Sequence, residues 1–184
     1  ALNAPAGDPA IAAGAFWVAM IFAGTLGGTR ALVSEWHNGC IRCLMLSPAE
    51  PASIYSAKLV ASFLFMAVAE IAATVIMVLF FNLDFGVRLL RLAPVLGMGA
   101  LGFAALTTLL AAIQVHIRTG ELLFALLVVP LFVPALIAGV EASNAALAGL
   151  SFAGFAQWLK ILAASDILFL AGGYLLFEHV MSED

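Results

Sequence analysis

The sequence predicts an all-α membrane protein, a polytopic bundle of transmembrane helices forming a single domain over residues 1–184. Hydrophobic residues make up 65% of the chain and charged residues only 10%, whereas soluble domains carry roughly 25% charged residues. The mean hydropathy of +1.16 points the same way. The apolar runs are long and continuous rather than alternating at every second residue, which excludes a transmembrane barrel and leaves helices.

A helix needs roughly 17–25 consecutive apolar residues to cross a bilayer. Five segments of the chain meet this requirement: 11–29, 59–81, 92–113, 122–140 and about 157–177. An odd number of spans places the two ends of the chain on opposite sides of the membrane. Little length remains for a soluble domain.

Residues 30–58 form the longest polar interruption between these spans. Leu32, Trp36 and Cys40 follow one another at helical spacing with polar residues between them, which predicts an amphipathic helix lying along the membrane surface. A capping-box pattern over Ser47–Glu50 then predicts a helix start at Pro48, or at Ser53 if Pro51 delays it. Lys58 is expected at the mouth of the next span.

Cys40 and Cys43 have the C-x-x-C spacing found in metal and haem sites, within "CIRCL". A c-type haem attachment site needs a histidine directly after the second cysteine, and Leu44 occupies that position. A zinc site needs two further ligands, which His37 alone does not supply. We therefore interpret the cysteines as small apolar residues on a helix face and expect no metal site.

Two carboxyl groups are predicted inside the membrane, where an ionisable side chain costs about 2.5–3.5 kcal/mol unless a partner, a cavity or a proton compensates. Glu70 lies well inside the second span, and Asp166 lies near the middle of the last one, next to Ser165. They could line one polar seam with a functional role. Protonated or hydrogen-bonded carboxyl groups that hold helices together explain them equally well.

Two prolines, Pro130 and Pro134, lie within the fourth span. Each removes a backbone hydrogen bond and bends the helix. A bent helix suits a moving part as well as it suits static packing.

The chain carries no catalytic motif. No G-x-x-x-x-G-K-[ST] sequence is present, so ATP cannot be bound through a P-loop, and any ATP-driven action must come from a partner. The chain is therefore not expected to be an enzyme. The net charge of −4 offers no basic surface for nucleic acid.

The polar stretch resembles the cytoplasmic loop of ABC-2-type permeases, in which an "E…G…L-x-L-S-P…K" pattern recurs. The matching residues are Glu35, Gly39, Leu44, Leu46, Ser47, Pro48 and Lys58. The segment "VHIRTGELLFALLVVPLFVPALIAGVEAS" is similar to the fifth membrane helix of the cytochrome c maturation protein B (CcmB) family, the permease subunit of the haem exporter. The resemblance covers essentially the whole chain.

This resemblance implies a six-helix permease of the bacterial inner membrane, with one further helix expected before Ala1. Residues 30–58 and 114–121 would be cytoplasmic, and residues 1–10, 82–91 and 141–156 periplasmic. An ATPase subunit (CcmA) would bind ATP and magnesium and push on the 30–58 coupling loop. CcmC and CcmD would be the other membrane subunits and CcmE the periplasmic haem chaperone. This chain would bind no cofactor, and the complex would act in haem export or in ATP-driven release of the haem-loaded chaperone.

Other classes of function remain open from the residues. An ABC-2 permease could carry a different substrate, and a proton-coupled transporter would use Glu70 and Asp166 without an ATPase. A non-transporting membrane scaffold would also fit the absence of a catalytic constellation.

Overall fold

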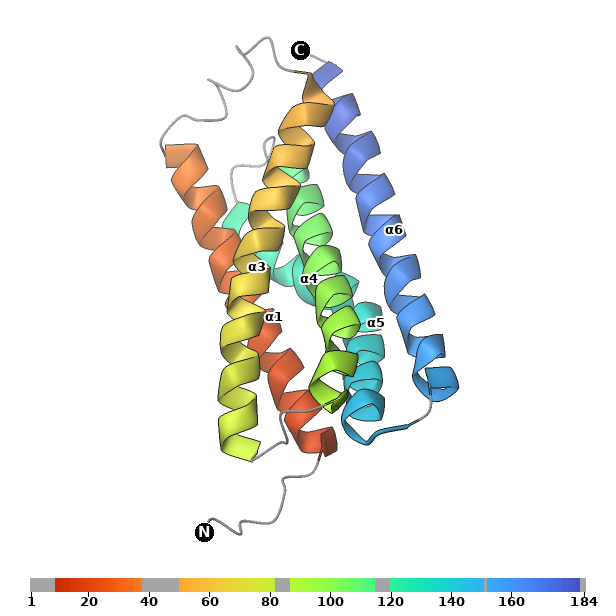
Figure 1. Ribbon diagram of the computed structural model, residues 1–184. Coiled ribbons are helices and arrows are strands. Elements are labelled where there is room, and N and C mark those ends of the chain that lie inside the picture. The colour runs from red at the N-terminus through yellow and green to blue at the C-terminus, as the bar shows by residue number, and fades with distance from the viewer. Residues whose placement is uncertain (1–8, 38–49, 82–86, 115–119, 151, 183–184) are drawn as a thin grey trace.

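The computed structural model is a bundle of long helices that run along one common direction (Figure 1). It describes residues 9–37, 50–81, 87–114, 120–150 and 152–182. The helices are α1 (Pro9–His37), α3 (Pro51–Phe81), α4 (Val87–Gln114), α5 (Gly120–Leu147) and α6 (Phe152–Ser182). No strand occurs within these ranges, so the all-α prediction is confirmed for the part of the chain that is described.

Each of the five helices contains a stretch long and apolar enough to cross a membrane. The stretches are Ala10–Gly27, Ala52–Phe80, Leu90–Leu110, Leu126–Leu147 and Gly154–Leu176. They overlap all five predicted spans, and the chain is a multi-pass membrane protein.

Three predicted boundaries are wrong. The helix α1 continues to His37, so residues 30–37 extend the first helix and do not begin a separate surface helix. No proline follows Pro9 within α1 to interrupt its hydrogen bonds. The helix α5 continues to Leu147, so residues 141–147, expected in the periplasmic connection, are helical.

The third correction concerns the start of α3, which is Pro51 rather than Pro48 or Ser53. The carbonyl of Glu50 accepts hydrogen bonds from the backbone amide of Ser53 at 2.9 Å and from its hydroxyl at 2.7 Å. Proline is favoured at the first helical position because its missing amide hydrogen would have had no helical partner there. Lys58 therefore lies within α3, about two turns from the start, and not in a loop.

The helix α4 is the centre of the bundle and packs against α3, α5 and α6, while α1 packs mainly against α5 and α3. The helices α1, α4 and α6 end, and α3 and α5 begin, toward one end of the bundle (Figure 1). We call this the 38–49 end. The helices α3 and α5 end, and α1, α4 and α6 begin, toward the other end, which we call the 82–86 end.

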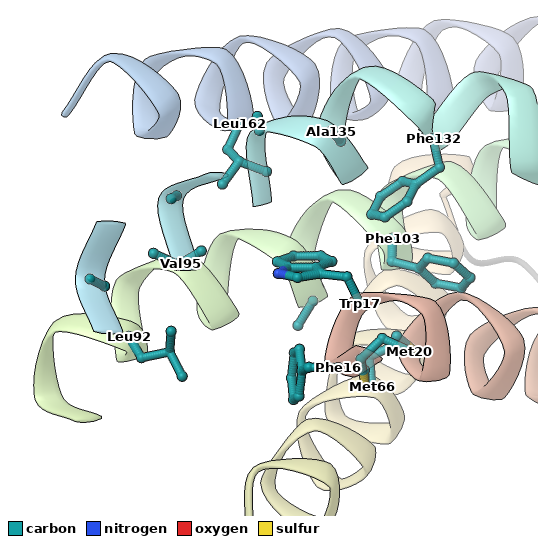
Figure 2. Packing of buried hydrophobic residues seen from close by; sticks show 14 of the residues in the cluster. Phe16, Trp17, Met20, Met66, Leu92, Val95, Phe103, Phe132, Ala135 and Leu162 are labelled. Atoms are coloured by element: carbon teal, nitrogen blue, oxygen red, sulfur yellow. The ribbon is translucent and has the colours of Figure 1, made fainter. Parts of the chain in front are cut away.

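Trp17 of α1 occupies the middle of the core, beside Phe16, Phe103 and Phe132 (Figure 2). Its ring lies so close to Gly99 of α4 and Gly139 of α5 that a β-carbon on either glycine would collide with it. Small residues let membrane helices approach closely, and here they make room for one large side chain from a third helix. The indole Nε1 donates a hydrogen bond to the hydroxyl of Ser143 in α5 at 2.9 Å.

The end of α5 is closed by a hydrogen-bond pattern that needs a left-handed residue. Gly149 has a φ of 74°. The amide of Gly149 donates to the carbonyl of Ala146, and the amide of Leu150 donates to the carbonyl of Ala145. This is a Schellman motif, and glycine adopts its positive φ without steric cost. Arg91 of α4 donates to the carbonyl of Leu150 at 3.2 Å and ties the α5–α6 connection to α4.

Candidate functional site

The predicted coupling loop falls largely outside the described residues. The residues of the loop that lie outside the described part are Gly39, Cys40, Cys43, Leu44, Leu46, Ser47 and Pro48. Glu35 belongs to the final part of α1, and the side chain of Lys58 is half-buried on α3. The coupling role of these residues and the interpretation of the cysteines stay predictions.

Glu70 faces the interior of the bundle. Its side chain is 4% exposed, whereas its neighbour Ile71 is 66% exposed. Met66 and Met77, at helical spacing on either side of it, are also buried, so the three share the inward face of α3. Within the described chain, Thr74 on the same side of α3 has a buried hydroxyl with no hydrogen-bond partner. The sequence predicted a buried Glu70, but the face of α3 on which it lies required the fold.

Asp166 lies where α6 packs on α4, and it is also 4% exposed. Its Oδ1 has no hydrogen-bond partner among the described residues. This oxygen lies beside Gly102 in α4, in the space that a β-carbon would occupy. A β-carbon on Gly102 would collide with this oxygen and would lie 3.9 Å from the ring of Phe132 in α5. The hydroxyl of Ser165 donates to the carbonyl of Ile161 in its own helix at 3.0 Å.

The two buried carboxyl groups lie at similar depths. Glu70 is eleven residues before Phe81, and Asp166 is fourteen residues after Phe152, at the same end of the bundle. A rise of about 1.5 Å per residue puts them about one helical turn apart in depth. Because Asp166 Oδ1 has no hydrogen-bond partner among the described residues, it is not bonded to Glu70. The predicted polar seam therefore stays a prediction about two sites that lie about one helical turn apart in depth.

A polar contact joins α3 to α6 near the 38–49 end. The hydroxyl of Tyr55 donates to the backbone carbonyl of Leu170 at 3.2 Å. The Tyr55 ring covers Gly173 and meets the ring of Tyr174 edge to face, with the ring centres 6.3 Å apart. Tyr55 belongs to α3, whereas Leu170, Gly173 and Tyr174 belong to α6. We call these four residues the Tyr55 clasp. Sequence reasoning missed it, because an isolated tyrosine at a helix start has no distinctive pattern.

Pro130 and Pro134 lie inside α5 with their side chains on the outer surface of the bundle. The α5 ribbon bends behind α4 in this half of the helix (Figure 1). A third internal proline, Pro94 of α4, was not singled out from the sequence and is also exposed.

No group of three or more histidine, cysteine, aspartate or glutamate side chains that could hold a metal ion occurs in the described part of the chain. The buried polar side chains of this part are Glu70, Thr107, Thr108, Ser143 and Asp166. The hydroxyls of Thr107 and Thr108 both donate to the carbonyl of Ala104 in their own helix. The arrangement offers buried acids and interhelical contacts, with no paired nucleophile and base among the described residues.

Comparison with known proteins agrees with this architecture. The model of the CcmB protein family matches residues 7–174. Heme exporter protein B of Pseudomonas aeruginosa is 34% identical over 155 residues, which cover 82% of this chain and 67% of that protein. The heme exporter protein B of Bradyrhizobium diazoefficiens is 31% identical over 72% of this chain, and that of Haemophilus influenzae is 34% identical over 69%.

The matched regions span 60% and 57% of the lengths of the last two relatives. No solved structure gives a significant match. A family match that runs from the start of α1 into the second half of α6 includes every helix of the bundle. The chain therefore belongs to the CcmB family.

Proposed function

We propose that this chain is the membrane permease subunit of an ABC transporter of cytochrome c maturation, acting in haem export or in ATP-driven release of a haem-loaded periplasmic chaperone. The observation that carries the proposal is the family match over residues 7–174, together with relatives named heme exporter protein B. A multi-pass bundle with no P-loop sequence is consistent with a permease that leaves ATP hydrolysis to another subunit.

The partners in this proposal are the ATPase subunit CcmA, the membrane subunits CcmC and CcmD, and the chaperone CcmE, in the bacterial inner membrane. ATP and magnesium bind to the ATPase, and haem is cargo of the complex rather than a cofactor of this chain. The helices α1 and α4 end, and α3 and α5 begin, at the 38–49 end of the bundle (Figure 1). That shared end is the side we assign to the cytoplasm and to the ATPase.

Co-purification tests the proposal. The chain is expressed with its host's ABC ATPase subunits, and the detergent-solubilised complex is analysed for a bound ATPase and for holocytochrome c yield. Replacing Glu35 and Gly39 by alanine should leave the permease in the membrane but lower both ATPase recovery and holocytochrome yield. Glu141→Gln, an exposed carboxyl near the other end of the bundle, serves as the control. Unchanged recovery and yield in the Glu35 and Gly39 variant would contradict the coupling role.

A proton-coupled transporter is a second candidate, favoured by Asp166. A buried carboxyl oxygen without a hydrogen-bond partner among the described residues is costly in a membrane, and such residues often mark proton pathways. This candidate predicts transport in vesicles driven by a pH gradient alone, without any ATPase. The permease proposal predicts that a pH gradient without ATP has no effect.

A further inference from the structure

The Tyr55 clasp attaches the beginning of α3 to the last part of α6. Tyr55 is the fifth residue of α3, so it closely follows residues 38–49 in the chain. Its side chain is 6% exposed, and its hydroxyl donates to the Leu170 carbonyl. The ring lies so close to α6 that a β-carbon at Gly173 would be 2.9 Å from its Cε2 atom. One side chain therefore makes a hydrogen bond, a backbone contact and an aromatic contact with a single helix.

The chemistry of these contacts makes the attachment stiff. The acceptor is a backbone carbonyl, which cannot rotate away from the hydroxyl as a side chain could. Separation of α3 from α6 would break this hydrogen bond and the ring contacts together. Gly173 lets the ring approach the α6 backbone, and any larger residue would hold the ring off.

Two close contacts between α3 and α1 lie farther from the start of α3. Gly24 and Gly27 of α1 face the side chains of Met66 and Phe65, ten or more residues beyond Tyr55 along α3. At the 38–49 end the ribbons of α3 and α6 converge, while α1 diverges from both (Figure 1). A displacement of the beginning of α3 therefore reaches α6 directly.

We propose that Tyr55 and Gly173 are positioning residues that transmit movement of the beginning of α3 into α6, so that α3 and α6 respond to the ATPase as one pair. This inference rests on the proposed function, because the ATPase supplies the movement. The helix pair then shifts against α1, whose close contacts at Gly24 and Gly27 lie farther along α3.

Distances between spin labels test this relay in the permease bound to its ATPase. Labels are placed on lipid-exposed positions, Phe22 of α1, Val60 of α3 and Leu168 of α6, in a chain that carries Cys40→Ser and Cys43→Ser. In the otherwise unchanged chain, ATP should alter the distance between positions 22 and 60. The distance between positions 60 and 168 should stay constant.

Two neighbouring glycines provide a matched pair of variants. Gly173→Ala places a β-carbon against the Tyr55 ring, whereas a β-carbon at Gly172 meets nothing within 4 Å. Gly173→Ala should make the distance between positions 60 and 168 respond to ATP, and Gly172→Ala should behave like the parent chain. Tyr55→Phe keeps the ring and removes the hydroxyl. It should raise the separated population of α3 and α6 roughly fivefold, the change expected for one lost hydrogen bond of about 1 kcal/mol.

The outcomes separate the relay from the proposed function. The relay alone is overturned if two results are found together. The ATP response between positions 22 and 60 is identical in the parent chain and in Gly172→Ala, Gly173→Ala and Tyr55→Phe. The distance between positions 60 and 168 stays constant in all four. A parent chain that binds no ATPase, or shows no ATP response at any pair of labels, overturns the proposed function and the relay with it. If Gly173→Ala fails to assemble, Tyr55→Phe decides the question, because its packing is preserved.

Discussion

Trp17 of α1 donates a hydrogen bond from its indole Nε1 to the hydroxyl of Ser143 in α5 at 2.9 Å, and both side chains are buried. The two residues are 126 positions apart in the chain. The same indole ring separates Gly99 of α4 from Gly139 of α5. One side chain thus joins three helices through both a polar and an apolar contact, and α1 is oriented by it.

Ser143→Ala should destabilise the bundle. It leaves the indole donor unsatisfied in an environment without water, at a cost of about 1 kcal/mol on the scale of interhelical bonds in membranes. The melting temperature in detergent measures the loss. Thr108→Val is the control, because the Thr108 hydroxyl bonds only to Ala104 within its own helix. Equal melting temperatures for the two variants would show that the interhelical bond contributes nothing.

Gly99→Ala should destabilise the protein far more than Gly97→Ala, although both replace a glycine in the same helix. A β-carbon at Gly99 collides with the Trp17 ring, whereas one at Gly97 meets nothing within 4 Å. Overpacking of this kind costs about 1–3 kcal/mol, while a glycine-to-alanine change in open space favours the helix by roughly 0.5–1 kcal/mol. Thermal unfolding of the two variants gives the comparison. A Gly99→Ala protein as stable as Gly97→Ala would exclude tight packing at Trp17.

Gly102→Ala should be destabilising because of Asp166, and removing the carboxyl group should reverse the effect. The added β-carbon has to displace Asp166 Oδ1 from the α4–α6 interface. Combining Gly102→Ala with Asp166→Ala frees that space, so the double variant should be more stable than Gly102→Ala alone. Combining it with Asp166→Asn keeps the crowding and should restore nothing. Restoration by asparagine, or none by alanine, would contradict the steric argument; melting temperatures of all variants decide it.

Glu70→Gln should assemble normally and support a holocytochrome c yield close to that of the parent chain. Glutamine keeps the size and hydrogen-bonding capacity of the side chain and removes only its acidic proton. Complex recovery and holocytochrome yield are measured together. Glu141→Gln, an exposed carboxyl on α5, is the control. A Glu70→Gln complex that is fully assembled but inactive would show that the acidic proton of Glu70 takes part in the cycle.

The sequence alone was sufficient to predict the number and approximate positions of the membrane spans. Crossing a bilayer depends on length and apolar composition, which are local properties of the chain. The predicted boundaries failed where a charged residue lies inside a helix. Lys58 and residues 141–147 were both placed outside the predicted spans, but they lie in helices that extend beyond the apolar runs on which the prediction depended. A long helix can carry a charged group near its end, where the group reaches the interface.

Burial of Glu70 and Asp166 could be predicted from their depth in apolar segments, but their surroundings could not. Nearly every residue around them is hydrophobic, so a face toward lipid and a face toward another helix have the same composition. Packing distinguishes these faces by size and shape, and shape complementarity involves residues far apart in the sequence. Gly99 and Gly139 match the Trp17 ring, Gly102 accommodates Asp166, and Gly173 accepts Tyr55 only because the tertiary structure brings each pair together.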